Sequence, residues 1–313
     1  MRAFRNTVKE NLESPQPDQV KPTERIAYSP ITERPPLTLP GGARMVVWVI
    51  VNVEEWDIDQ TMPRTVLTPP AGGSPMPDVP NWAWHEYGNR VGFWRMIEVL
   101  DRHEIRAVLA VNGTAARTYA PIARAAKERE WEFMGHGFTQ RNMQKVENER
   151  EDIARTTEAL AEAAGGKRPR GWLGPGLTET WETPDLLVEN GYHYVADWVL
   201  DDQPVVLKTR TKPIVNIPYT QENNDVAMML IQHHPAREYF ERAMDQFDQL
   251  YHDAAHGSAR VMALVVHPYI MGAPHRLKYF RMIFERLRER SDVLFWTGEQ
   301  ILAWYLKERP LGL

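Results

Sequence analysis

The segment MVVWVIVNVEEW, from Met45 to Trp56, constrains the fold more than any other part of the chain. Its apolar run Met45–Val53 is too short to span a bilayer and is rich in β-branched residues, which predicts a buried strand. Glu54 and Glu55 follow at the carboxyl end of this strand, where folds with parallel strands build their active sites. Because adjacent strand residues point to opposite faces, we expect the two carboxylates to take different roles. A solvated acidic turn is the alternative interpretation.

Charge and composition exclude several classes of protein. The formal net charge of −5 leaves no basic footprint, so we expect no nucleic-acid partner. Cysteine is absent, which excludes disulfides, a thiol nucleophile and cysteine-ligated zinc. The N-terminal segment lacks the apolar stretch of a secretory signal, and no run approaches 18 apolar residues. We therefore expect a cytoplasmic protein that does not bind a membrane.

The chain divides into two parts by composition. Residues 1–40 are polar and rich in proline, which predicts an extended arm that wraps its own domain or a neighbouring subunit. Residues 41–313 alternate strand-like and helix-like segments, which predicts one α/β domain with a parallel barrel or a doubly wound sheet. Residues 57–90 contain many Gly and Pro and are expected to form a long binding loop.

The expected elements after the first strand follow from periodicity and from Gly and Pro positions. Strands are expected at residues 106–111, 131–134, 171–173, 192–198, 214–217, 228–231, 260–266 and 293–296. Helices are expected at residues 92–103, 119–130, 149–164, 184–190, 237–252 and 278–290, with a last helix from residue 298.

Residues with useful chemistry follow many of these strands. Besides the glutamate pair they are Asn112, His136, Trp172, Asp197, Asp202, Asp225 and His267, and His85 and Glu86 lie at the end of the long loop. A single histidine at a strand end is more often structural. Several acidic residues and histidines at one end of a barrel suit acid–base hydrolysis or a metal-bound water.

Four segments in this order resemble the polysaccharide deacetylase superfamily, which is also called the NodB-homology or carbohydrate esterase 4 fold. They are VNVEEW, FMGHGFTQRN, RGWLGPG and VVHPYIMGAPHR. The segments HEYGNRVGFWR, VLDDQP and IPYTQENND resemble its cytosolic branch, which includes metal-independent allantoinase-like and cyclic-imide-hydrolase-like proteins. The resemblance covers residues 44–305 and implies a distorted (β/α) barrel with fewer than eight strands.

The resemblance also implies roles for individual residues. Glu54 matches the general base, Glu55 a metal ligand, His136 the first metal-binding histidine and His267 the general acid. Pro175 matches the proline that shapes the groove. We accordingly predict catalytic roles for Glu54, Glu55, His136 and His267, and substrate contacts for His85, Glu86, Trp172, Pro175, Asp202 and Asp225.

The sequence departs from the metal-dependent pattern of this superfamily. Both acidic residues of the first motif are glutamates where relatives carry aspartates, Gln140 stands where a second histidine is usual, and Leu173 replaces an arginine. A catalytic zinc site takes three protein ligands, and Glu55 and His136 supply two. We therefore favour a site without a tightly bound metal, while a zinc ion held by Glu55, His136 and His85 stays the alternative.

These observations predict a hydrolase that acts on a C–N bond in a small, cyclic amide, imide or ureide. A glutamate would activate water, a histidine would protonate the departing nitrogen, and a donor near residues 174–176 would stabilise the oxyanion. Trp56, Trp172 and Trp198 would wall the pocket. The alternatives are a metal-dependent N-deacetylase of an amino sugar or peptidoglycan fragment, and a catalytically silent ligand-binding or scaffold protein. The arm and the resemblance together lead us to expect a homo-oligomer, either a dimer or a tetramer.

Overall fold

Strand β1, Met45–Val53, is buried along its whole length and pairs in parallel with three other strands. One edge carries β8, Arg260–Val266, along residues 45–51. The other edge is shared by β9, Val293–Phe295, beside residues 45–47 and by β2, Val108–Val111, beside residues 50–53. The computed structural model describes residues 20–70, 72–73 and 76–311, and the predicted first strand has the same bounds in it.

The sheet continues from β2 in the order β2-β3-β4-β5-β7-β6. These strands are β3 Glu132–Gly135, β4 Gly171–Trp172, β5 Tyr194–Val195, β6 Val205–Leu207 and β7 Ile214–Asn216. Within the described residues all strand pairs are parallel except β6 with β7. Parallel pairing brings the carboxyl ends of β1, β3 and β8 to the same edge of the sheet, which is where the chemistry-bearing residues follow.

Loops bridge the two ends of this curled sheet. The backbone N–H of Val261 donates to the carbonyl of Asp202 at 2.9 Å, and Asn224 forms an isolated bridge with Val265. The fold is therefore a distorted (β/α) barrel, as predicted. The strand count differs from the expected number below eight, because the sheet has nine strands in the part of the chain that is described. The number below eight was implied by the resemblance, whereas the short strands β4, β5, β7 and β9 lie where the sequence predicted strands.

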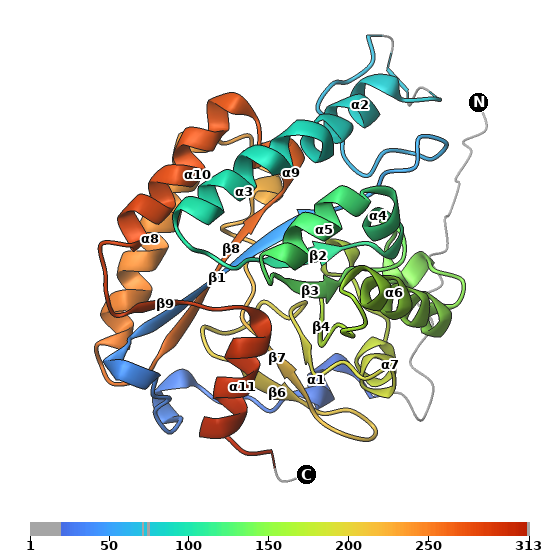
Figure 1. The fold of residues 1–313 in the computed structure, drawn as a ribbon. Coiled ribbons are helices and arrows are strands. Elements are labelled where there is room, and N and C mark those ends of the chain that lie inside the picture. Colours follow the sequence, from blue (N-terminus) through green and yellow to red (C-terminus); the bar gives the residue numbers. More distant parts are fainter. Residues whose placement is uncertain (1–19, 71, 74–75, 312–313) are drawn as a thin grey trace, which may run out of the picture.

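Helices cover the outer face of the barrel (Figure 1). They are α2 Val79–Tyr87, α3 Phe93–Arg102, α4 Gly113–Thr118, α5 Ala120–Glu128, α6 Glu149–Ala163, α7 Thr183–Glu189, α8 Ala236–Ala254, α9 Pro268–Met271 and α10 Pro274–Leu287. Helix α11, Gly298–Glu308, packs instead with the inward-facing side chains of β1. The short helical turns are α1 Pro22–Arg25, η1 Ile31–Glu33, η2 Pro40–Gly42, η3 Gly88–Gly92, η4 Met143–Lys145, η5 Pro175–Leu177 and η6 Val226–Ile231.

The alternation of side chains along β1 separates two layers of core. Val47 and Val49 pack outward in one cluster with residues of α3, α5, α8 and α10. Trp48 and Ile50 point inward and pack with residues of β2, β3, β5 and β7, such as Tyr194. Trp48 also donates its indole N–H to the carbonyl of Pro218 at 2.9 Å. Continued past the end of the strand, this alternation puts Glu54 on the inward face.

Two of the predicted elements are wrong in type. Residues 228–231, expected as a strand, belong to the π-helical segment η6, Val226–Ile231. A short apolar run does not distinguish strand from helix, and here the side chain of Asn224 accepts a hydrogen bond from the N–H of Val226 and starts a helical turn. Residues 57–90 are not one loop, because α2 begins after Asp78, whose carboxylate caps the N–H of Asn81.

Other predicted elements are confirmed with shifted ends, and several short elements were not predicted. The expected strand at residues 192–198 shortens to β5, and the helix expected at residues 278–290 begins earlier, at Pro274. The short elements that were not predicted include the helices α1, α4 and α9 and the antiparallel strand β6. All are brief, and none lies in a strongly periodic segment.

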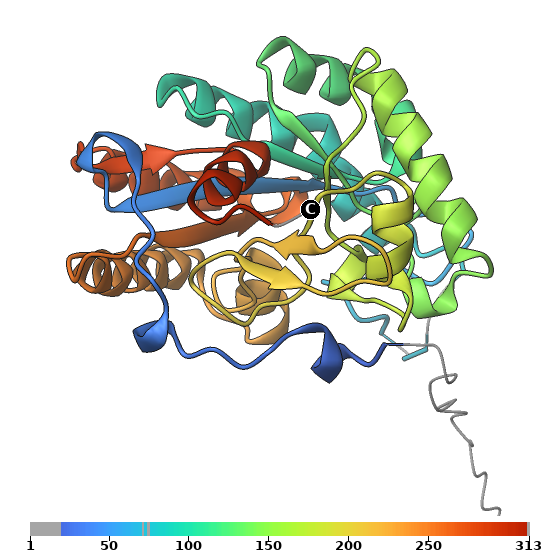
Figure 2. The same ribbon diagram turned by 90° about the horizontal axis from the view of Figure 1, so that it is seen from below.

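The described part of the N-terminal arm, residues 20–40, runs along the side of the barrel near β6 and β7 (Figure 2). Arg25 forms a buried ion pair with Asp185 at 2.6 Å and also donates to the carbonyl oxygens of Lys208 and Trp181. Farther along, Leu37 and Leu39 join the inner core. This part of the arm therefore wraps its own chain, while residues 1–19 lie outside the described residues. The division into arm and single domain, and the homo-oligomer, stay predictions.

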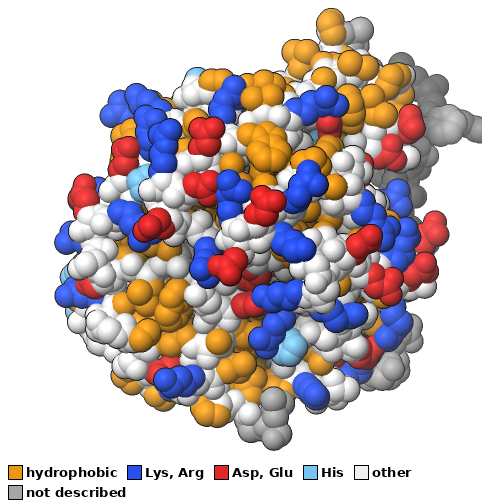
Figure 3. All heavy atoms as spheres, viewed as in Figure 1, with side chains coloured by type: hydrophobic (Ala, Val, Ile, Leu, Met, Phe, Trp, Pro, Cys, Tyr) orange, Lys and Arg blue, Asp and Glu red, His pale blue; other side chains and the backbone are white. Residues whose placement is uncertain are grey.

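The surface in Figure 3 is charged, and the helices are those of a protein without a membrane-spanning helix in its described residues. Basic and acidic side chains are interspersed over the face that Figure 3 shows. Across the described residues, every helix is either too short or too polar to cross a bilayer.

Candidate active site

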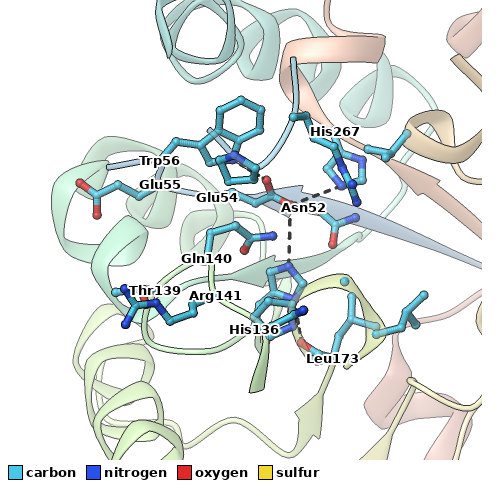
Figure 4. A pocket seen from close by; sticks show the side chains of 18 of the residues that line it. Asn52, Glu54, Glu55, Trp56, His136, Thr139, Gln140, Arg141, Leu173 and His267 are labelled. Atoms are coloured by element: carbon cyan, nitrogen blue, oxygen red, sulfur yellow. Dashed lines mark hydrogen bonds and ion pairs between the residues drawn. The ribbon is translucent and has the colours of Figure 1, made fainter. Parts of the chain in front are cut away.

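Glu54 lies between two imidazoles at the carboxyl end of the sheet (Figure 4). Its Oε1 is 3.8 Å from Nε2 of His136, which follows β3, and 3.6 Å from Nε2 of His267, which follows β8. All three side chains are buried, with 7% or less of each exposed. The barrel therefore brings together three of the four predicted catalytic residues.

Each imidazole is oriented through its other ring nitrogen. Nδ1 of His136 lies 2.6 Å from the carbonyl oxygen of Leu173, and Nδ1 of His267 lies 2.6 Å from Oδ1 of Asp225. Carbonyl and carboxylate oxygens only accept, so Nδ1 carries a proton in both rings and Nε2 is the atom that faces Glu54. Asp225 also accepts the backbone N–H of His267 at 2.8 Å. Predicted as a substrate contact, Asp225 instead holds His267 in place.

Within this cluster, the carboxylate of Glu54 and the imidazole of His267 shift each other's pKa toward the charged forms. Burial alone would raise the pKa of Glu54, but its interactions with His136 and His267 hold the pKa well below its usual range. Burial by itself would lower the pKa of His267. The negative charges of Asp225 and Glu54 outweigh this effect and raise the pKa to about 9. At neutral pH the site thus holds an ionised carboxylate beside a protonated imidazole.

Aromatic side chains form one wall beside Glu54. Trp56 donates its indole N–H to Oε2 of Glu54 at 2.8 Å and stacks on His85, with ring centroids 4.1 Å apart. Tyr269 packs edge-on against Trp56. His85 is fully buried behind this wall, and burial lowers its pKa to about 4, so its ring is neutral. We conclude that His85 supports Trp56 from behind.

Glu55 differs from Glu54 in position and partners, as the alternation of a strand predicts. Its carboxylate points away from the two imidazoles in Figure 4 and accepts a hydrogen bond from the hydroxyl of Thr118 at 2.7 Å. Its backbone N–H donates to Oδ1 of Asn112 at 3.1 Å. Glu55 borders the same cavity, so a role in binding is open to it, but it does not reach the cluster around Glu54.

The cavity above Glu54 has a volume of about 1160 Å³. Pro175, predicted to shape the groove, lines it together with Trp56. The sequence analysis did not identify Tyr219, Tyr269, Arg64, Arg141 and Lys145, which also line it. Arg141, Tyr219 and Tyr269 lie in segments on which the resemblance rests, but no role was assigned to them, and Arg64 and Lys145 lie outside those segments. Only the packing of distant loops brings all five to the mouth of the barrel.

The remaining predicted substrate contacts lie outside this cavity. Trp172 is fully buried in a core cluster against Tyr192, because the inward side of β4 is occupied by packing. Glu86 faces Arg90 at 3.2 Å and accepts the hydroxyl of Tyr119. Asp202 lies at the closure of the barrel, where its carbonyl accepts the N–H of Val261. Of the three tryptophans expected as walls, Trp56 lines the cavity, whereas Trp172 and Trp198 do not.

Part of the chain matches a known protein family. The family model described as polysaccharide deacetylase matches residues 84–195. These residues therefore belong to a polysaccharide deacetylase domain. A protein of Schizosaccharomyces pombe provisionally named polysaccharide deacetylase is 25% identical over 303 residues, covering 86% of this chain and 92% of that protein. A peptidoglycan deacetylase of Helicobacter pylori is 22% identical over 257 residues, covering 72% of this chain and 87% of that enzyme.

Among solved structures, that of PuuE allantoinase is similar over almost the whole chain. The TM-score is 0.79 at 25% sequence identity, and the match covers 90% of this chain and 96% of the allantoinase. The chain is therefore similar both to an allantoinase of known structure and to a peptidoglycan deacetylase.

The side chains of this site do not provide a suitable set of ligands for the metal ion that usually accompanies this fold. Within residues 20–70, 72–73 and 76–311 there is no group of three or more His, Asp or Glu that could hold a metal ion. Glu54 faces the Nε2 atoms of His136 and His267, but these three side chains are not arranged as a group that could hold a metal ion. Glu55 and His85, the other predicted ligands, lie away from this pair. A catalytic zinc takes three protein ligands, and the described residues do not bring three together at this position.

Proposed function

We propose that this protein is a hydrolase of C–N bonds in a small, cyclic amide, imide or ureide. The observation that carries the proposal is Glu54 held between two imidazoles whose Nδ1 atoms are fixed by Leu173 and Asp225. The cavity above them is open to a substrate, and the similarity to PuuE allantoinase over almost the whole chain supports a cyclic ureide-like substrate.

In the proposed mechanism, Glu54 binds and deprotonates a water molecule that attacks the substrate carbonyl. His267 gives a proton to the nitrogen as the C–N bond breaks. The ion pair keeps both groups in the required protonation states at neutral pH, because the carboxylate stays ionised and the imidazole stays protonated. Trp56 and Tyr269 form an apolar wall against which a planar ring can stack.

The cavity volume supports a second candidate. At about 1160 Å³ the cavity exceeds what one small ring needs, and an amino sugar would also enter. The H. pylori peptidoglycan deacetylase is similar over 87% of its length. N-deacetylation of an amino sugar or a peptidoglycan fragment is therefore the alternative reaction of the same site.

The test is an activity screen run beside a metal analysis of the same purified protein. Allantoin, hydantoin, succinimide and N-acetylglucosamine are supplied with and without a chelator. We expect ring opening of at least one cyclic substrate, with a rate that the chelator leaves unchanged. Release of acetate that depends on equimolar zinc would support the alternative instead, and no turnover of any substrate by a folded protein would favour a silent binding protein.

A further inference from the structure

Gln140 has an orientation that neighbouring backbone groups determine. Asn112 accepts the backbone N–H of Glu55 through Oδ1, so the opposite end of its amide is the donor. This donor, Nδ2, is bonded to the carbonyl of His136, which only accepts, and the two assignments agree. The same Nδ2 donates to Oε1 of Gln140 at 3.0 Å. The oxygen of Gln140 is thus engaged, and its Nε2 carries two hydrogens for other partners.

The amide of Gln140 lies at the catalytic cluster. Gln140 lines the cavity, and Figure 4 shows its side chain directed toward the space between Glu54 and His136. Because Oε1 is held by Asn112, the end that faces this space is the NH₂ group. An NH₂ group donates hydrogen bonds and is no ligand for a metal ion.

Residues 174–176, where a donor was predicted, offer few backbone donors. The N–H of Gly174 is bonded to Oδ1 of Asp197 at 2.7 Å, and Pro175 has no N–H. The N–H of Gly176 is the remaining backbone donor of this segment, whereas Gln140 offers a side-chain donor beside Glu54 and His136 (Figure 4). The proposed hydrolysis still needs a donor where negative charge develops.

We propose that the Nε2 amide of Gln140 is the oxyanion donor of this site, a catalytic residue that occupies the place of an electrophilic metal. The inference rests on the proposed hydrolysis. Water adds to the carbonyl carbon while its proton passes to Glu54, and the C=O electron pair moves to the oxygen that Gln140 binds. The pair then reforms C=O, the C–N bond breaks, and the nitrogen takes a proton from His267. The proton on Glu54 returns to His267, 3.6 Å away, and resets the site.

The first experiment separates Gln140 from its surroundings by steady-state kinetics on whichever cyclic substrate the screen identifies. Q140L removes the donor, and Q140E keeps the shape while replacing NH₂ with an acceptor. We expect kcat to fall by about 10²–10³ in both with a much smaller change in KM, since the donor acts on charge that develops in the transition state. Q249L, a substitution of an exposed glutamine on α8, is the matched control. Unchanged kcat in a folded Q140E would overturn the proposal.

The second experiment does not depend on turnover. Zinc chloride is titrated calorimetrically into the wild type and into Q140H, which places a third metal-ligating side chain beside Glu54 and His136. We expect weak binding to the wild type and at least tenfold tighter, near-equimolar binding to Q140H. Equimolar tight binding by the wild type would contradict the orientation of the amide, and no gain in Q140H would contradict its placement. A screen without turnover, together with the expected zinc result, would reject the proposed function but leave the geometry of Gln140 standing.

Discussion

Two buried glutamates at opposite ends of the barrel have pKa values that are shifted in opposite directions. Glu54 follows β1 at the carboxyl end, where two imidazoles hold its pKa well below the usual range. Glu132 begins β3 at the amino end, where burial raises its pKa to about 7. Its partners are neutral donors, namely the hydroxyl of Tyr194 at 2.6 Å and the backbone N–H of Glu299 at 2.8 Å.

The comparison shows that burial alone does not decide what a carboxylate can do. Both glutamates lose solvent, which disfavours the charged form. At Glu54 two imidazoles outweigh that cost, and the result is an ionised base that faces a cavity. At Glu132 two neutral hydrogen bonds do not outweigh it, and the group ties β3 to β5 and to the first turn of α11. The same strand, β3, leads from the structural carboxylate to His136 of the site.

The largest expected effect comes from removing the charge of Glu54. Glu54→Gln should lower kcat by about 10²–10⁴, because it removes the general base. Steady-state kinetics on the substrate found by the screen measures this loss. Glu132→Gln is the matched control at the other end of the barrel and should stay within a few-fold of the wild type. A similar loss of kcat in both variants would contradict the assignment of a catalytic role to Glu54 and a structural role to Glu132.

The second prediction concerns stability at the other end. The folded-state pKa of Glu132 is raised, so its contribution to stability is complete below about pH 4.5 and is lost as pH rises through about 7. Glu132→Gln mimics the protonated form and should remove this loss, which is on the order of 3 kcal/mol in the free energy of unfolding. Urea denaturation between pH 4.5 and 8 measures it. Parallel pH profiles for variant and wild type would show that Glu132 does not titrate as inferred.

The third prediction uses the pH dependence of the site. With His267 as the acid and its pKa at about 9, the rate should be level through neutral pH and fall as pH rises through about 9. Asp225→Asn removes the main group that raises this pKa, so the alkaline limb should move to lower pH and kcat at pH 8 should fall by about tenfold or more. Titration of the His267 ring by NMR gives the pKa directly. An unmoved alkaline limb in Asp225→Asn would assign it to another group.

The smallest effect is expected at the neighbour of the base. Glu55→Gln leaves the cluster around Glu54 untouched and should change kcat by less than about tenfold, because Glu55 faces Thr118. The same assay and a thermal melt measure it. A loss equal to that of Glu54→Gln would show that both carboxylates act in the chemistry, and would contradict the roles inferred from their positions.

Much of the barrel could be predicted because its signals are local. The bounds of β1, the long helix α6 and the strand β8 follow from continuous apolar runs or helical periodicity. Strands β4 and β5 were predicted in place but too long, because pairing with neighbouring strands decides where such short strands begin and end. Trp172 illustrates the limit, because its position at the end of a predicted strand suggested a pocket wall and the structure buries it in the core.

The sequence by itself determined that an acidic pair ends a buried strand and that its two carboxylates face opposite ways, because the alternation of a strand is local geometry. It also placed His136 and His267 at strand ends. Only the tertiary structure decided that Glu54 is the glutamate facing both imidazoles, because the closure of the barrel determines which side is the interior. Asp225 behind His267 and the amide orientation of Gln140 depend on hydrogen bonds between residues far apart in the chain, which no local pattern records.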